Sequence, residues 1–335
     1  MKKHCVLRVL LRILIVLIVV VAAAAILWGV AFLHRSSPAQ IKRYETSNPH
    51  IFPESRLSAH RSGAGIVPEE LLAGFKYCID SDDFQVDYFE FDLHLTADDQ
   101  LVLLHDAVLD RTSDAETVFG RSGMTAAECT LADLQRLNMG AKFVNEQGEM
   151  PYAGLSGDDV PDDLRIATLD QVLDLLTAGG NYNFVIEIKD GDERGRRAAD
   201  LLYADLKSRG LLERAVISSF NAKTLGYVRT AYPDAITGAG IGDVVDFFFA
   251  AILNRADYVP PFQVIQLPFE KDPRHCYYLN FGTAMIINYA HAHNVSVQYW
   301  TVNDEDDMAY LISLGADAIT TDYPDRFQRV MNAAK

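Results

Sequence analysis

Two carboxylates, Glu90 and Asp92, alternate along residues 87–94, a stretch that is otherwise rich in apolar and aromatic residues. In a β-strand, residues i and i+2 point to the same side, so both carboxylates would face one way. Burying two negative charges costs free energy unless a cation neutralises them. The pair therefore predicts a divalent-metal site, and the alternatives are a solvated strand edge or an ion pair with Lys or Arg.

Three other polar clusters end apolar stretches in the same manner. They are His60-Arg61, His105-Asp106 and Glu187-Ile188-Lys189. In a barrel of parallel strands, the carboxyl ends of the strands meet at one mouth, where active sites are built. At such a mouth, Arg and Lys would bind an anion, a metal would clamp phosphate oxygens, and two His side chains would exchange protons. Together the clusters predict a metal-assisted phosphoryl site.

The elements that must position these clusters are short strands that alternate with helical patterns. The predicted strands are 56–60, 87–94, 101–105, 183–188, 215–219, 235–238, 264–268, 295–301 and 318–321, and the predicted helices are 68–79, 169–178, 194–208, 222–231, 243–255, 282–293 and 305–314. About eight strand–helix units favour an α/β fold of the TIM (β/α)₈ barrel type over an open doubly wound sheet. Residues 107–167 interrupt this rhythm and are predicted to form a small insertion on the barrel rim, after the second strand region.

The composition limits the class of protein. Apolar residues make up 49% of the 335 residues and charged residues 23%, which excludes a disordered chain. Residues 45–335 hold all 46 acidic residues but only 23 of the 30 Lys and Arg residues. A domain this acidic suits a divalent cation and argues against a nucleic-acid partner, whose phosphates need basic contacts. The first predicted strand is followed by neither a dinucleotide fingerprint nor a Walker lysine.

The N-terminus contains an uncharged run of 21 residues, 13–33. As a helix it would span roughly 30 Å, the thickness of a bilayer core. We therefore expect residues 1–34 to form a cytoplasmic stub and an uncleaved transmembrane anchor, with a cleaved signal peptide or a buried helix as alternatives. A small excess of Lys and Arg before the run places the N-terminus in the cytoplasm and the catalytic domain outside the cell membrane. Residues 35–54 would be a linker and residues 55–335 the barrel.

A set of short motifs runs in a fixed order through residues 56–327. The motifs are His60-Arg61, Pro68-Glu69, Glu90-Phe91-Asp92, Thr96-Ala97-Asp98-Asp99, His105-Asp106, Leu109-Asp110-Arg111-Thr112, Glu187-Ile188-Lys189, Ser218-Ser219-Phe220, Trp300-Thr301-Val302-Asn303 and the stretch 315–324. In this order they resemble the motifs of the glycerophosphodiester phosphodiesterase family. The chain as a whole resembles a bacterial, membrane-anchored member of that family. The resemblance implies a TIM barrel that hydrolyses a glycerophosphodiester to an alcohol and sn-glycerol 3-phosphate.

The resemblance also implies roles for individual residues. Glu90, Asp92 and Glu187 would hold one Ca²⁺ or Mg²⁺ ion, His60 and His105 would be the general acid and base, Arg61 and Lys189 would hold the phosphate, Glu69 would support the site, and Trp300 would form the pocket wall. Hard oxygen ligands suit Ca²⁺ or Mg²⁺ better than Zn²⁺. The nucleophile would be water or the 2-hydroxyl of the substrate, through a cyclic phosphate.

Two residues depart from the family pattern. Ser62 stands where the family has Gly after His-Arg, at a position where Gly would permit a positive φ or a close approach of phosphate. Glu70 stands where the family has Asn, and it would add negative charge near an anion site. Both replacements bear on how the substrate fits, because neither removes a proposed ligand or proton carrier.

Two other functions are compatible with these residues. One is a phospholipase D-like enzyme that cleaves lysophospholipids or a glycerophosphate wall polymer, since such a site would use the same His and metal-binding residues. The other is a catalytically silent barrel that binds phosphate, although the proposed His and carboxylate residues are all present. Fold alone does not choose among them, because function depends on the site.

Overall fold

The computed structural model describes residues 2–270 and 279–333, and eight of its strands form a ring of parallel strands. These strands are β1 (Arg56–His60), β2 (Tyr88–Leu95), β4 (Asn183–Ile188), β5 (Ala215–Ser218), β6 (Ile236–Thr237), β7 (Val264–Pro268), β8 (Ser296–Trp300) and β9 (Ala318–Thr321). Their order in the sheet is β6-β5-β4-β2-β1-β9-β8-β7. A parallel bridge between Gly238 and Val264 connects the two ends of this order. The predicted TIM-like barrel is therefore confirmed as a nearly closed barrel of eight parallel strands.

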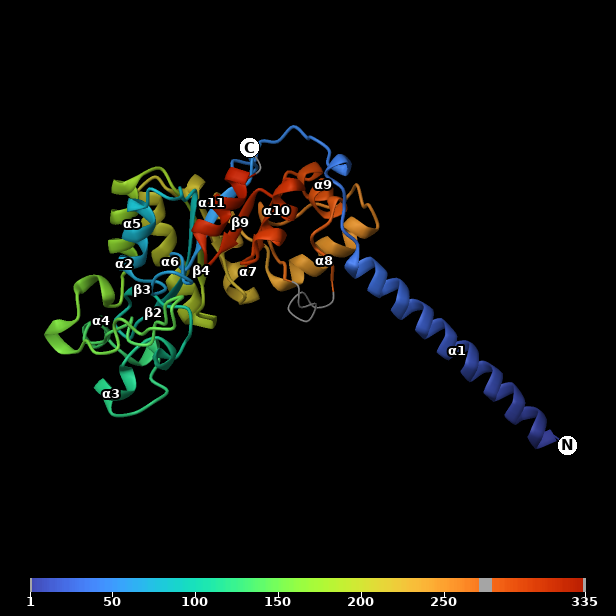
Figure 1. Cartoon of the computed structure of the whole chain (residues 1–335), viewed down its shortest axis with the longest axis horizontal. Helices are drawn as coiled ribbons and strands as arrows, with labels where there is room; N and C mark the ends of the chain where they lie inside the picture. Colours follow the sequence, from blue (N-terminus) through green and yellow to red (C-terminus); the bar gives the residue numbers. More distant parts are fainter. Residues whose placement is uncertain (1, 271–278, 334–335) are drawn as a thin grey trace.

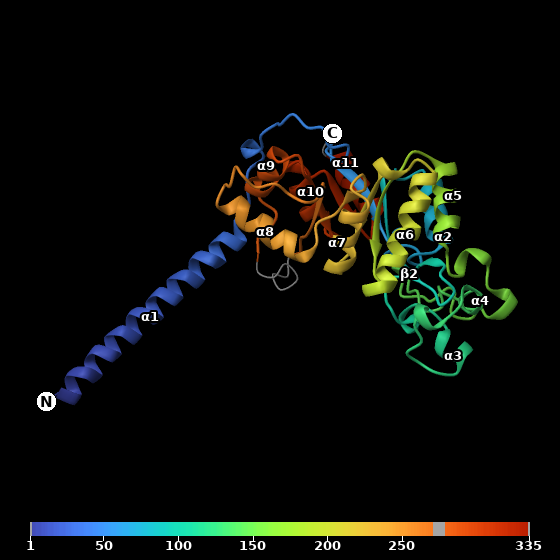
Figure 2. The same cartoon turned by 180° about the vertical axis from the view of Figure 1, so that it is seen from behind.

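Each barrel strand leads into a helix on the outside of the ring (Figures 1 and 2). The helices are α2 (Leu72–Asp80), α5 (Leu169–Gly179), α6 (Asp192–Ser208), α7 (Ala222–Ala231), α8 (Ile241–Ile252), α9 (Ala284–Ala292), α10 (Glu305–Ser313) and α11 (Pro324–Ala333). Several begin at a side chain that accepts a hydrogen bond from the first turn, as Thr168, Asn221 and Asp304 do. These caps fix where a strand ends and its helix begins.

The core has an outer and an inner layer, because side chains alternate along each strand. On the outer side, Phe75 of α2 packs against Phe89 and Phe91 of β2, with ring centroids 5.4 and 5.9 Å apart. On the inner side, a small apolar cluster that includes Tyr88 and Val264 fills the bottom of the barrel. The inner residues nearer the carboxyl ends of the strands are polar, so the candidate catalytic residues lie above the apolar cluster at the bottom of the barrel.

One predicted barrel strand has a different place in the fold. The stretch 101–105 forms the short strand β3 (Leu101–Leu103), which pairs antiparallel with the end of β2 and stands outside the barrel order. The prediction was wrong there because β2 continues past the mouth, and its last residues need a partner that the ring does not supply. The chain returns along this hairpin, and Leu104 donates to the carbonyl of Asp92 at 3.1 Å. His105 reaches the mouth by this return.

Residues 107–167 pack as a small lobe beside the mouth (Figure 1, green). They form α3 (Ala115–Phe119), α4 (Leu131–Leu134) and the 3₁₀ turns Leu109–Arg111, Ala126–Glu128, Gly157–Asp159 and Asp162–Leu164. The lobe has its own apolar cluster, which includes Leu109, Leu134 and Leu164 and also takes in Leu104 after β3. The insertion is thus anchored to the same hairpin that carries His105.

The N-terminal helix α1 (Lys2–Leu33) projects away from the barrel in both views (Figures 1 and 2). The side chains of α1 are described only at residues 12–26 and 29, and no helix is long and apolar enough to cross a membrane when the search is limited to such described residues. The predicted transmembrane helix is therefore not confirmed. Residues after α1, predicted to be a linker, are held against the barrel. Arg35 forms an ion pair with Asp307 at 2.8 Å, and Ser36 donates its N–H to the Tyr310 hydroxyl at 2.9 Å.

The loop from β1 to α2 contains three non-glycine residues with positive φ: Arg61 at 47°, Ser62 at 61° and Glu70 at 62°. The predicted helix 68–79 begins only at Leu72, because Glu70 leaves the helical region and donates its N–H to the Arg61 carbonyl at 3.2 Å. Ser62 adopts the conformation expected for Gly. Its fully buried side chain donates to the Arg61 carbonyl at 2.6 Å, and it is not among the residues that line the mouth.

Ser62 fits because α2 has a glycine opposite it. A Cβ atom on Gly74 would lie 2.5 Å from the Ser62 hydroxyl oxygen. We predict that Gly74→Ala lowers the free energy of unfolding by about 2 kcal/mol, a typical value for overpacking, and that Ser62→Gly removes most of this loss. Urea unfolding of the two single variants and the double variant measures the coupling. An equal loss in both backgrounds would contradict the proposed clash.

Candidate active site

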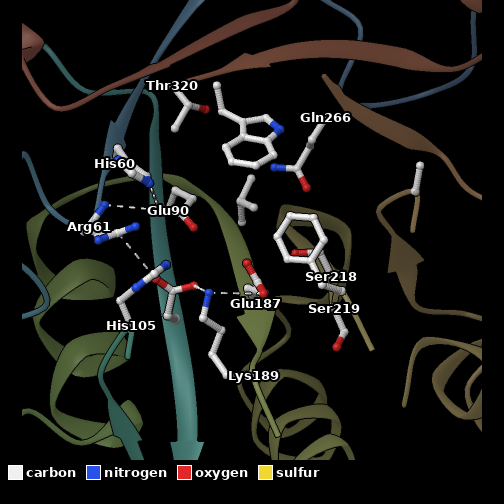
Figure 3. A pocket seen from close by; sticks show the side chains of 15 residues that line it. His60, Arg61, Glu90, His105, Glu187, Lys189, Ser218, Ser219, Gln266 and Thr320 are labelled. Carbon is white, nitrogen blue, oxygen red and sulfur yellow. Dashed lines mark hydrogen bonds and ion pairs between the residues drawn. The ribbon is translucent and has the colours of Figure 1, made fainter. Parts of the chain in front are cut away.

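The barrel mouth contains a pocket at the carboxyl ends of the strands (Figure 3). It is lined by His60, Arg61, Glu90, Asp92, Val185, Glu187, Lys189, His105, Ser218, Ser219, Phe220, Ala239, Gln266, Trp300 and Thr320. The structure thus brings together eight of the nine residues predicted from the sequence. The ninth, Glu69, lies just behind the pocket, where its Oε1 is 3.3 Å from Nη1 of Arg61.

Three carboxylates meet on one side of this pocket because their two strands pair directly. Asp92 of β2 is in register with Glu187 of β4, and Glu90 precedes Asp92 on the same face. One oxygen from each of the three carboxylates lies within 4.8 Å of the others. Burial, together with the negative charge of Asp92, raises the pKa of Glu90 to about 7 and that of Glu187 to about 8. Three converging oxygen donors with this mutual repulsion fit a hard divalent cation.

Two basic side chains partly neutralise the carboxylates. The Lys189 Nζ lies 3.1 Å from Oδ1 of Asp92 and 3.2 Å from Oε1 of Glu187. The Arg61 Nε lies 3.7 Å from Oδ2 of Asp92. Burial alone would lower the pKa of Lys189, but the two carboxylates raise it, so the ammonium group stays charged. Both cations border the pocket, where they can also bind an anion.

Each predicted catalytic histidine has its own carboxylate partner. The Nδ1 of His60 is 2.6 Å from Oδ1 of Asp322, and the Nδ1 of His105 is 2.6 Å from Oδ1 of Asp106. These hydrogen bonds leave both Nε2 atoms available for proton transfer. Burial opposes a charge on His60, yet Glu90 and Asp322 raise its pKa, whereas burial lowers the pKa of His105. The two rings therefore differ in the protonation state that they favour.

Four further polar residues position these rings, and the sequence analysis assigned them no role. Asn303 donates to Oδ2 of Asp322 at 2.7 Å and so fixes the carboxylate behind His60. Arg111 hydrogen-bonds Asp106, and its Nη1 donates to Oε2 of Glu69 at 2.9 Å. Arg111 thereby ties the loop of His105 to the loop of Arg61. Their position in the sequence could have indicated these roles, because Asp106, Arg111, Asn303 and Asp322 all lie within the motifs noted above.

Glu70 lies beneath the carboxylate cluster and outside the pocket lining. Its Oε1 accepts a hydrogen bond from the backbone N–H of Asp92 at 3.1 Å. Burial and the neighbouring Asp92 raise the pKa of Glu70 well above its ordinary value. These surroundings disfavour a negative charge on Glu70, so the site opposes the charge expected from this replacement.

Comparison with known proteins places this geometry in a family. The model of the glycerophosphoryl diester phosphodiesterase family matches residues 60–326. A glycerophosphodiester phosphodiesterase of Caldanaerobacter subterraneus subsp. tengcongensis is 30% identical over 269 residues, which make up 80% of this chain and 93% of the relative. A relative of that name in Bacillus subtilis is 28% identical, covering 81% of this chain and 85% of the relative.

Solved structures share the fold. A putative glycerophosphoryl diester phosphodiesterase from Silicibacter pomeroyi superposes with a TM-score of 0.63 at 24% identity and covers 85% of this chain and 95% of its own. A phosphodiesterase of Oleispira antarctica, solved with the product sn-glycerol-3-phosphate, has a TM-score of 0.60 at 20% identity and covers 83% and 97%. Since the family model spans nearly the whole barrel, this chain belongs to the glycerophosphoryl diester phosphodiesterase family.

Proposed function

We propose that this protein hydrolyses glycerophosphodiesters to an alcohol and sn-glycerol 3-phosphate, and that the reaction depends on a divalent cation and two histidines. The observation that carries the proposal is the placement of His60, His105 and three carboxylates around one pocket. Family membership supports the reaction class. The small phosphodiester fits a pocket that combines cations, proton carriers and an aromatic wall.

The cation would be Ca²⁺ or Mg²⁺, held by Glu90, Asp92 and Glu187. Both ions take oxygen ligands, and the three carboxylates supply oxygens within 4.8 Å of one another. Such an ion, when bound, would supply positive charge to the phosphate oxygens. Its charge would also remove the need for Lys189 to neutralise Asp92 and Glu187, so that Lys189 and Arg61 would hold the phosphate.

The two histidines would divide the proton transfers between them. His105, whose pKa is lowered, is suited to act as the general base toward water or the 2-hydroxyl of the substrate. His60, whose pKa is raised, is suited to protonate the departing alkoxide. Asp106 and Asp322 would hold each ring with Nε2 toward the pocket. The ring centroids of Trp300 and Phe220 are 5.7 Å apart. Trp300 would form the pocket wall that contacts the organic part of the substrate.

The decisive assay measures sn-glycerol 3-phosphate released from glycerophosphocholine by the full chain in detergent. We expect activity to vanish after chelation and to return with Ca²⁺ or Mg²⁺. His60→Ala and His105→Ala should each lower kcat by at least ~10², as expected for acid–base groups. His34→Ala, an exposed histidine before the barrel, is the matched control. Activity within threefold of the parent in both site variants would refute their catalytic assignment.

A second candidate is phospholipase D-like cleavage of lysophospholipids or of a glycerophosphate wall polymer. One observation favours the lipid form: Phe220 is 51% exposed on the pocket rim, where it could contact an acyl chain. Release of choline from lysophosphatidylcholine, with little release from glycerophosphocholine, would select this candidate. A catalytically silent barrel has no comparable support, because the His and carboxylate residues lie together.

We further propose that α1 anchors the protein in the cell membrane as a single span, with its N-terminus in the cytoplasm and the barrel outside. The support is the uncharged run 13–33 and the exposure of its side chains. Ile13–Val21 are 51–62% exposed, and an apolar helix surface of this kind is unfavourable in water. The flanking Lys and Arg residues set the proposed orientation.

The anchor predicts that the full chain stays with membranes after a carbonate wash. Val16→Arg combined with Val20→Arg should release it, since each central Arg costs about 3 kcal/mol on insertion scales. Val259→Arg, at a residue that is 82% exposed on the barrel, should leave it bound. Protease added outside intact cells should digest the barrel. Recovery of the unchanged chain in the carbonate supernatant would rule out the anchor.

A further inference from the structure

The outer side of α8 carries a row of apolar side chains that the barrel leaves exposed. The exposed fractions of these side chains range from 42 to 69%, and the residues are Ile241, Val245, Phe249, Ile252 and Leu253. Steps of three and four residues relate these positions and keep them on one face of the helix. The other face is buried in the barrel through Phe247, Phe248, Ala250 and Ala251. A helix that is apolar on both sides calls for an apolar environment on both.

The acidic residues of α8 lie beside this row rather than within it. Asp243 accepts a hydrogen bond from Arg229 at 2.7 Å, which holds its carboxylate toward the neighbouring helix α7. Asp246 lies about one turn further along α8, at the edge of the row. A contiguous apolar surface of this kind is uncommon on a soluble monomer and marks a site of interaction. We call the five apolar residues the α8 face.

The α8 face lies close to the base of α1. In both views α1 meets the barrel beside α8 and α9 (Figures 1 and 2). The hydroxyl of Ser36, just after α1, accepts a hydrogen bond from the N–H of Ala284, the first residue of α9, at 3.0 Å. Phe281, just before α9, packs against Phe248 of α8 with ring centroids 5.4 Å apart. These contacts fix the chain that leaves α1 relative to α8.

The direction of α8 also suits a lipid surface. In both views α8 runs across the line of α1 and lies on the side of the barrel from which α1 projects (Figures 1 and 2). The surface of a bilayer that α1 spans would therefore run along α8. Amphipathic helices on membranes lie in this plane, with the apolar face toward the acyl chains. The exposed Lys42, which lines a hollow with Ala251 and Met285, adds a cation where lipid phosphates would lie.

The α8 face begins at the rim of the pocket. Ala239 lines the pocket and lies two residues before Ile241, the first residue of α8. Phe220, which is also exposed, lines the same pocket. From this rim the α8 face follows the helix to Leu253, just past the Ala251 that borders the hollow with Lys42. One edge of the pocket is thus continuous with the α8 face.

We propose that the α8 face rests on the lipid surface beside α1 and holds one edge of the pocket at the level of the lipid headgroups. The inference rests on the proposed anchor and goes beyond it, because a tethered barrel could also stand clear of the membrane. Removal of five apolar side chains from water favours the contact. The hydrogen bond from Ala284 to Ser36 limits how far the barrel can turn about the end of α1.

Fluorescence quenching by brominated lipids tests this contact on the full chain. Phe249→Trp is made in a Trp28→Phe background, since Trp28 lies in the proposed span, and the emission of that background is subtracted. The protein is reconstituted into phosphatidylcholine vesicles, and flotation measures how much is bound. Bromine near the headgroup end of the acyl chains should reduce the emission of the introduced indole at least ~twofold. Adding Ile241→Glu and Leu253→Glu should remove most of this quenching while the chain still floats.

Tyr77→Trp in the same background is the matched control. Tyr77 is an exposed aromatic residue on α2, which follows β1, and β1 lies four strands around the ring from the β6 strand that precedes α8. The indole introduced there should keep its emission in brominated vesicles. Melting curves by circular dichroism that match the parent confirm that each variant is folded.

Equal emission from Phe249→Trp in brominated and ordinary vesicles, with the chain floating, would overturn the inference while leaving the anchor in place. An indole that is shielded from bromine only at high protein concentration would assign the α8 face to a second copy of the chain, which would also overturn it. A chain that does not float would refute the anchor and the inference together. None of these results depends on hydrolysis, which the glycerophosphocholine assay tests separately.

Discussion

The repulsion among three buried carboxylates is the constraint on which the mouth of this barrel depends. Asp92 lies between Glu90 and Glu187, and burial raises the pKa of both glutamates to about 7 and about 8. Lys189 and Arg61 are drawn to the cluster, as their short distances to Asp92 show. The residues that would hold a phosphate are therefore placed by the same charges that would hold a cation.

The fold supplies this arrangement through strand pairing. The register between β2 and β4 sets Asp92 beside Glu187, and the β2–β3 hairpin returns His105 to the pocket. Arg111 then ties the hairpin loop to the loop after β1 through Asp106 and Glu69. Histidines, cations and carboxylates thus come from separate segments, yet each is held by a backbone pairing or a charged contact.

Local sequence patterns predicted many of the strands and site residues. The features that they did not predict depend on contacts between residues distant in sequence. The bounds of β1, β4, β7 and β9 were predicted to the residue, because their apolar runs end at turns. Contacts distant in sequence decided the rest: the pairing of 101–105, the left-handed Glu70 that delays α2, and the raised pKa of that carboxyl beneath Asp92. The buried polar side chains of Gln298 on β8 and Thr320 on β9, which make no hydrogen bond within the described residues, were also not predicted, since alternation along one strand does not reveal what faces it across a barrel.

The central claim is that the carboxylate cluster is a cation site, and proton release tests it most directly. At pH 7 the metal-free cluster holds protons on Glu187 and partly on Glu90, because both pKa values are raised, and a bound cation requires both to ionise. Calorimetry of Ca²⁺ binding in buffers of different ionisation enthalpy should show roughly one to two protons released per ion at pH 7, falling toward none by pH 9. Glu187→Gln should bind Ca²⁺ more weakly and release fewer protons. Saturating Ca²⁺ binding without proton release at pH 7, or no binding at all, would contradict the account.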